Sequence, residues 1–265
     1  MSETPIVTNP LLSKIKLPGK IYQLPSKGFF YQGLELSPEA KDAEVHVHAM
    51  TALDEINMKN PDMLFSGKAI EAVCQSAVND IRQPRELLSK DVDALMIFLR
   101  IVSYGQYFDV DITHTCKEAK AQTYTIDLEK IIDNMKYLDP TMVDSIFSLT
   151  LENGQVVRFQ PVRYKHVIEL MQNNDRKKEF TAEDIQNIIV KNVLNLIQSV
   201  DGITDPKQID EWLRQIPARY MNRLADKVEQ INDFGPNTIQ KMKCKDCGGE
   251  LDVELPLNPI NFFSE

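Results

Sequence analysis

Hydrophobic residues between positions 51 and 105 follow a helical pattern. Apolar side chains recur there in two stripes with the i, i+3, i+4 and i+7 spacing that places them on one helix face. Thr51 and Ser89 are helix-capping residues, and each precedes a periodic stretch, while Asn60-Pro61 should interrupt the first. We therefore predict a helical region with a small core. The stripes are Ile70, Val73, Cys74 and Ala77, and Val92, Leu95, Met96 and Leu99.

Beyond residue 105 the pattern changes to the alternation of β-strands. Glu152-Asn153-Gly154 has the composition of a hairpin turn between two alternating stretches. Helical signals return near Tyr164, and Thr181 and Asp205-Pro206 mark later helix starts. The pattern predicts an α+β fold, mainly helical, with small antiparallel hairpins. The predicted strands are 107–115, 123–128, 146–151 and 156–160, and the predicted later helices are 181–199, 206–213 and 217–232.

The first 33 residues contain four prolines, which prevent a long helix. We expect an extended arm whose apolar residues lie along another surface. Leu24, Phe29 and Phe30 are the positions here that we expect to contact a partner protein. A disordered tail is the alternative.

The segment 258–263 near the C-terminus contains two adjacent phenylalanines. If exposed, Phe262 and Phe263 would be good anchors for a neighbouring subunit, because aromatic side chains carry much of the binding energy at interfaces. The alternative is that both rings fold back into the core of their own chain.

Composition and charge limit the classes of function. The 265 residues are 43% hydrophobic, enough for an ordinary core in one domain or two. A net charge of −9 argues against binding to nucleic acid or anionic membranes, which requires a basic surface. No apolar run approaches the roughly 20 residues that span a bilayer, and the N-terminus does not resemble a signal peptide. We therefore expect neither membrane insertion nor secretion by that route.

The clearest chemical motif is Cys244-Lys-Asp-Cys247, followed by Gly248 and Gly249. Two thiolates separated by two residues can bind one tetrahedral metal ion, and the glycines permit the positive φ angles of the turn. Four cysteines in a chain of this length, two of them in such a turn, fit a reducing compartment. The motif therefore predicts a zinc knuckle.

A degraded copy of the knuckle lies far upstream. Cys116 begins it, and Ala119 stands where the second cysteine would be. A structural zinc has four protein ligands, so Cys116 is the candidate third ligand and His114 the candidate fourth. The alternatives are a knuckle that has lost its metal and, less favoured, a redox pair, because redox Cys-x-x-Cys motifs precede a helix in a βαβ unit. Cys74, in an apolar stripe, should be a core residue.

Three consecutive regions follow from these patterns. We expect an extended N-terminal arm with short strands at 1–48, a helical domain at 49–105, and a mixed domain at 106–265. The mixed domain holds the two knuckles, at 114–128 and 244–257, so a zinc-knuckle-like element would form from sequence-distant segments.

Several short motifs occur in a fixed order in the N-terminal half. They are Leu24-Pro-Ser-Lys-Gly-Phe-Phe-Tyr31, Met50-Thr-Ala-Leu-Asp-Glu55, Asn60-Pro61, Ser89-Lys-Asp-Val-Asp-Ala-Leu95 and Leu99-Arg-Ile-Val-Ser-Tyr-Gly105. Together they resemble the T-even phage base plate protein family, over most of the chain from about residue 20. The resemblance implies a role in the assembly or structure of the central hub of a contractile-tail baseplate, without established catalytic residues. Ala119 departs from the paired knuckles that the family implies.

No active-site motif is evident in the sequence. It has no phosphate-binding glycine loop, no Gly-x-Ser-x-Gly elbow and no His-Glu-x-x-His pair. We therefore expect a non-enzymatic virion protein that contacts baseplate hub and tail proteins in a hetero-oligomer, located in the tail baseplate and, during assembly, in the host cytoplasm. One alternative is a transient assembly chaperone for hub proteins that is absent from the mature virion. Another is a metal-dependent enzyme, which zinc held by three ligands and water would favour.

Overall fold

The computed structural model describes residues 19–113, 116, 121–174 and 182–263. These residues form helices and small antiparallel sheets, so the predicted α+β class is confirmed. Their buried apolar side chains gather in two clusters, the first core, mainly from residues 24–135 and 253–263, and the second core, mainly from residues 138–234. Within the described part of the chain, no helix is long and apolar enough to cross a membrane.

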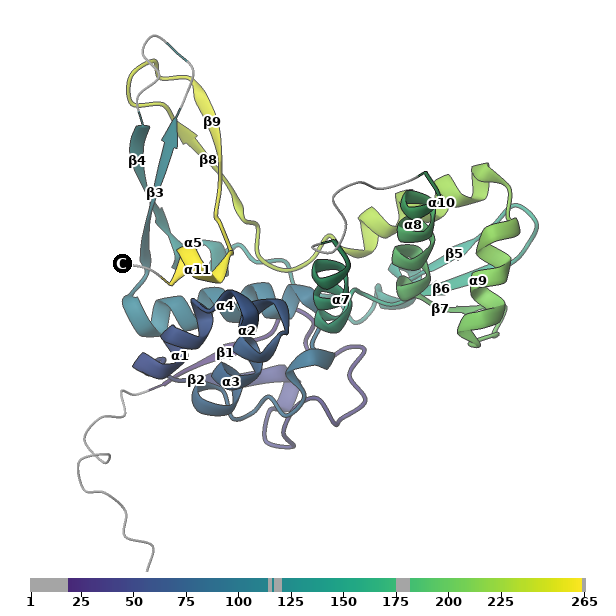
Figure 1. Ribbon diagram of the computed structural model, residues 1–265, viewed down its shortest axis with the longest axis horizontal. Coiled ribbons are helices and arrows are strands. Elements are labelled where there is room, and N and C mark those ends of the chain that lie inside the picture. Colours follow the sequence, from purple (N-terminus) through teal and green to yellow (C-terminus); the bar gives the residue numbers. More distant parts are fainter. Residues whose placement is uncertain (1–18, 114–115, 117–120, 175–181, 264–265) are drawn as a thin grey trace, which may run out of the picture.

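The first core lies among short helices and a two-stranded sheet at the lower left of Figure 1. Its helices bury the two predicted apolar stripes, since Val73, Cys74 and Leu95 are completely inaccessible to solvent. The C-terminal segment returns to this core, so the core is discontinuous in sequence, whereas the expected regions are consecutive. The elements are β1 (Lys20–Gln23), β2 (Glu44–Val47), α1 (Ala52–Met58), α2 (Pro61–Phe65), α3 (Lys68–Ala77), α4 (Ser89–Tyr104), α5 (Leu128–Asp133) and α11 (Pro259–Phe262).

Helix starts around the first core follow local sequence, with one exception. Thr51 forms a complete capping box with Asp54 at the start of α1, as predicted for its capping role. Ser89 was expected to cap α4, but the cap position is Leu88 and Ser89 is the first helical residue. The Ser89 N–H donates to the carbonyl oxygen of Val162 at 2.8 Å, and the Asp91 N–H donates to the carbonyl oxygen of Leu88 at 3.0 Å.

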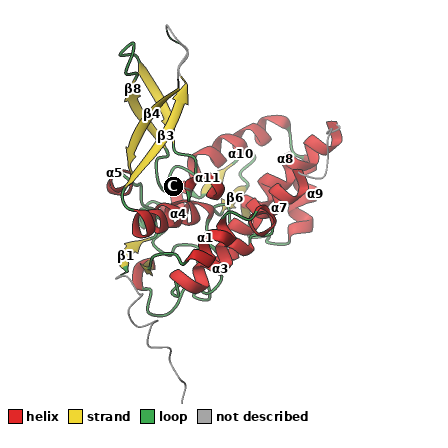
Figure 2. Ribbon diagram, turned by 60° about the vertical axis from the view of Figure 1, so that its left-hand side comes forward, coloured by secondary structure: helices red, strands yellow, loops and turns green. Residues whose placement is uncertain are grey.

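Two hairpins project from the first core to form the upper part of Figures 1 and 2. They are separate two-stranded antiparallel sheets. Strands β3 (Tyr107–Thr113) and β4 (Ala121–Asp127) pair over seven positions, and β8 (Ile239–Lys243) and β9 (Glu250–Glu254) pair over five. The sequence analysis predicted β3 and β4 as strands.

The second core lies at the right of Figure 1, where a three-stranded sheet packs against helices. The predicted turn at 152–154 connects the first two strands of this sheet. The sheet has the order β5-β6-β7. Its elements are α6 (Val143–Ile146), β5 (Ser148–Thr150), β6 (Val156–Phe159), α8 (Ala182–Leu196), β7 (Ile197–Val200), α9 (Pro206–Gln215) and α10 (Ala218–Ile231), while α7 (Tyr164–Asn174) packs beside the first core.

Strand β7 corrects the sequence prediction, which continued a helix to residue 199. Helix α8 ends at Leu196, and the next residues pair antiparallel with β6. The free edge of β6 offers backbone hydrogen bonds to this segment, and the buried Ile197 and Val200 favour a strand. Pairing with a distant strand therefore overrides the local helical pattern.

The loop between Leu24 and Tyr31 joins the two cores. Leu24 is buried in the first core, whereas Phe30 stacks edge-on against Phe147 of the second at 4.6 Å between ring centroids. Asp91 of α4, fully buried, accepts hydrogen bonds from the Ser26 N–H at 2.9 Å, the Ser26 hydroxyl at 2.5 Å and the Tyr31 hydroxyl at 2.5 Å. These contacts therefore fix the loop against other parts of its own chain.

Candidate metal centre

Three cysteine sulfurs meet at the outer end of the two hairpins. Cys116 follows β3, and Cys244 and Cys247 lie in the turn after β8. The three Sγ atoms lie within 4.8 Å of one another, and those of Cys116 and Cys244 are 3.9 Å apart. They are close enough to bind one metal ion together, and the structure thus brings together three of the four ligands predicted from the sequence.

Backbone hydrogen bonds shape the turn that holds two of these thiols. The Cys244 N–H donates to the Gly249 carbonyl oxygen at 2.8 Å, and the Gly248 N–H donates to the Cys244 carbonyl oxygen at 2.9 Å. Gly248 has a φ angle of +71°, which a side chain would strain, so the predicted need for glycine here is confirmed. The Gly249 N–H points at the Cys247 sulfur, at 3.4 Å. The turn therefore directs both sulfurs to the same side.

The electrostatics of the thiols depend on how close they lie. The Gly249 N–H lowers the pKa of Cys247, but the neighbouring Cys244 sulfur, desolvation and Cys116 raise it by more, so the net shift is upward. Such clustering disfavours several thiolates without a cation, and a bound cation would reverse this effect. The arrangement suits metal binding better than a free nucleophile.

Two other residues, His114 and Cys74, are not part of this cysteine cluster as the structure describes it. His114 lies outside the described residues, so its role as fourth ligand stays a prediction. Cys74 is fully buried in the first core, as expected, and burial raises the pKa of its thiol.

Polar contacts also link the hairpins beside the cysteines. The Lys245 N–H donates to Gln122 Oε1 at 3.3 Å, and its ammonium group donates to the carbonyl oxygen of Thr123. The same ammonium group lies 5.1 Å from the centre of the Tyr124 ring, and the Gln122 amide donates to Asp246. Lys245 and Gln122 were not singled out from the sequence, because only the tertiary structure brings them together.

Three of the five residues expected to bind partners are completely buried, and the other two are half-buried. Phe262 and Phe263 are completely inaccessible and pack against each other, and Phe262 also lies 5.0 Å from Phe108 between ring centroids. Leu24 is equally inaccessible. Phe29 and Phe30 are half-buried and pack on the second core. The alternative in which both C-terminal rings fold back into the core describes the structure.

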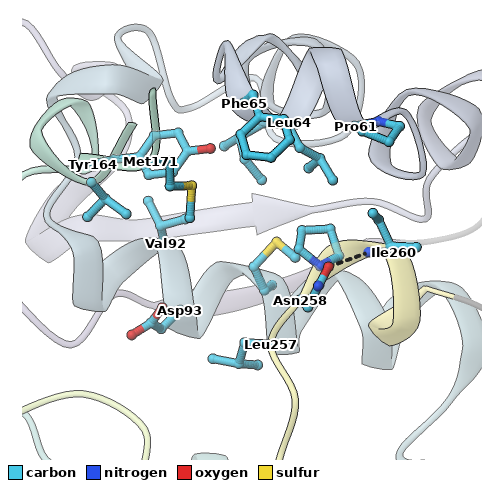
Figure 3. A pocket seen from close by; sticks show the side chains of 14 residues that line it. Pro61, Leu64, Phe65, Val92, Asp93, Tyr164, Met171, Leu257, Asn258 and Ile260 are labelled. Atoms are coloured by element: carbon cyan, nitrogen blue, oxygen red, sulfur yellow. Dashed lines mark hydrogen bonds between the residues drawn. The ribbon is translucent and has the colours of Figure 1, made fainter. Parts of the chain in front are cut away.

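A different apolar surface is open to solvent. It is a groove of about 380 Å³ bounded by α2, α4, α7, α11 and the segment before α11. Figure 3 shows the side chains that line it. Phe65, Met171 and Ile260 line it from three different elements and are 42%, 47% and 37% exposed. Among its described lining residues, Asp93 is charged and none is basic. Burial raises the pKa of Asp93, although Lys90 lies 3.5 Å away and lowers it.

One of the comparisons with known proteins found a matching family. A family model described as T4 bacteriophage base plate protein matches residues 41–264. The matched range contains the three clustered cysteines and all the residues that line the groove. No curated protein and no solved structure matches the chain.

Proposed function

The chain belongs to the T4 bacteriophage base plate protein family, and we propose that it is a structural component of the baseplate hub in a contractile phage tail. The family match over residues 41–264 is the observation that carries this conclusion. Membership indicates a structural role in the phage baseplate, a location in the virion tail and contacts with other tail proteins. The position in the hub, a part in its assembly, and passage through the host cytoplasm are the finer proposals.

The proposal assigns no catalytic step to this protein. Its three-cysteine centre has a structural role, and zinc is the ion that a set of thiolates favours. His114 remains the predicted fourth ligand. A closed shell of protein ligands leaves no position for substrate or reactive water.

The groove between α2, α4 and α7 replaces the buried phenylalanines as the proposed docking surface. Its occupant in this proposal is a segment of a neighbouring tail protein that carries apolar side chains and one lysine or arginine. The apolar side chains would cover Phe65, Met171 and Ile260, which are exposed around one opening. The basic group would pair with Asp93, the charged residue of this lining. Through this proposed contact, the chain would form part of a hetero-oligomer.

Mass spectrometry of purified phage particles tests the role. Several copies of the chain per particle, in a fixed ratio to a hub protein, are expected for a structural component. Abundance in the infected-cell lysate together with absence from particles would contradict this role and favour the assembly chaperone.

A further inference from the structure

We infer that a zinc ion bound by Cys116, Cys244 and Cys247 clamps the β3–β4 and β8–β9 hairpins into one rigid arm. This inference rests on the proposed structural role of the centre and goes further, because it assigns the metal a mechanical task between two segments distant in sequence. Cys116 and Cys244 are 128 residues apart.

The positions of the sulfur atoms fit a tetrahedral ion. With zinc–sulfur bonds of about 2.3 Å, two sulfurs of a tetrahedral site are separated by about 3.8 Å. The Cys116 and Cys244 sulfurs are 3.9 Å apart, and all three sulfurs fall within 4.8 Å. The same 3.9 Å separation is far longer than the roughly 2.0 Å of a disulfide bond. Little movement is therefore needed for the three thiolates to bind one ion.

The donor set selects the metal. Magnesium and calcium prefer oxygen ligands, whereas thiolates favour zinc, copper(I) or an iron–sulfur cluster. An iron–sulfur cluster is commonly held by four cysteines. The chain has only four, and Cys74 is buried in the first core, away from the centre. A single zinc ion, which mixed thiolate and nitrogen ligands also suit, is the best match.

The hairpins need a clamp because each is a two-stranded sheet. Isolated two-stranded hairpins are marginal in water. Near the first core, Ile126 and Val253 are buried and hold the hairpins in place. At the outer end, the contacts through Lys245 and Gln122 involve exposed side chains, which stabilise weakly. The three-thiolate centre is the strong connection available there.

The ligands are divided unequally between the hairpins, and this division makes the inference testable. Cys244 and Cys247 belong to one hairpin, and Cys116 is the ligand from the other. Loss of Cys116 should leave a two-thiolate knuckle in β8–β9 and separate β3–β4 from it. Loss of Cys247 should weaken the metal site but leave one thiolate on each hairpin.

The test combines metal analysis with amide hydrogen exchange on the full chain, purified under reducing conditions and supplied with zinc. We expect one zinc per chain. Chelation with EDTA should then accelerate exchange in the outer pairs of both hairpins by at least about tenfold, because local opening no longer breaks metal bonds. The Cys116→Ser variant should show this fast exchange in β3–β4 with or without zinc. Cys74→Ala, which removes a cysteine outside the centre, should keep both zinc and slow exchange.

Two results would overturn the inference in different ways. If Cys116→Ser keeps one tightly bound zinc and slow exchange in β3–β4, the metal belongs to the β8–β9 knuckle alone and is no clamp. If the wild-type chain binds no zinc after saturation, the zinc assignment of the centre fails as well. Neither result bears on the baseplate role, which the particle analysis tests separately.

Discussion

Asp91 offers a sharp prediction because two physical effects oppose each other at its carboxyl group. Burial raises its pKa from 3.8 to about 6, although hydrogen bonds from Ser26 and Tyr31 lower it. A shift of about two units corresponds to about 3 kcal/mol of differential stability. Because the folded-state pKa is the higher one, Asp91 contributes this stability below about pH 4, and the contribution is lost as the pH rises through about 6.

The perturbation is Asp91→Asn, which keeps the shape of the side chain and cannot ionise. Other carboxyl groups, such as Glu55 and Asp80, have lowered pKa values and act in the opposite direction, so the wild-type curve alone is not informative. The informative quantity is the difference in unfolding free energy between wild type and variant. We expect the wild type to lose about 2.5 kcal/mol relative to the variant between pH 4 and pH 7.

Urea denaturation followed by circular dichroism at several pH values measures this difference. Asp226→Asn, at an exposed position, controls for the loss of one negative charge. A difference that stays constant from pH 4 to pH 7 would refute the raised pKa. A difference that changes with the opposite sign would show that the hydrogen bonds from Ser26 and Tyr31 outweigh desolvation.

Two further predictions concern the C-terminal segment and the groove. Phe262→Ala should lower the unfolding free energy by about 3–5 kcal/mol, because the ring is fully buried. Ile260→Ala, at a partly exposed position, should lower it much less. Equal losses of unfolding free energy in urea denaturation would contradict the role of Phe262 in the core. Met171→Glu should reduce incorporation into phage particles by adding a charge to the apolar groove, while Met142→Glu, exposed to a similar extent at 51% against 47%, should not. Equal incorporation of both, by mass spectrometry of purified particles, would remove the groove as a docking surface.

Several elements follow from local chemistry and could be predicted from the sequence. Thr51 and Asp205 cap helices where their side chains can reach the free N–H groups of the first turn. The alternating stretches around 107–113 and 156–159 became strands, and the Cys244 turn formed around Gly248. Each of these features depends on residues within a few positions of one another, so a single segment contains the information.

Contacts between segments distant in sequence could not be predicted from local patterns. Residues 197–200 left the helical pattern because the edge of β6 was free to pair with them. Phe262 and Phe263 became core residues because the first core receives the C-terminal segment, a fact absent from the local composition. The approach of Cys116 to the Cys244 turn likewise depends on how two hairpins project from one core. Such contacts arise from the shape and burial of the whole fold, which a periodic pattern along the chain does not specify.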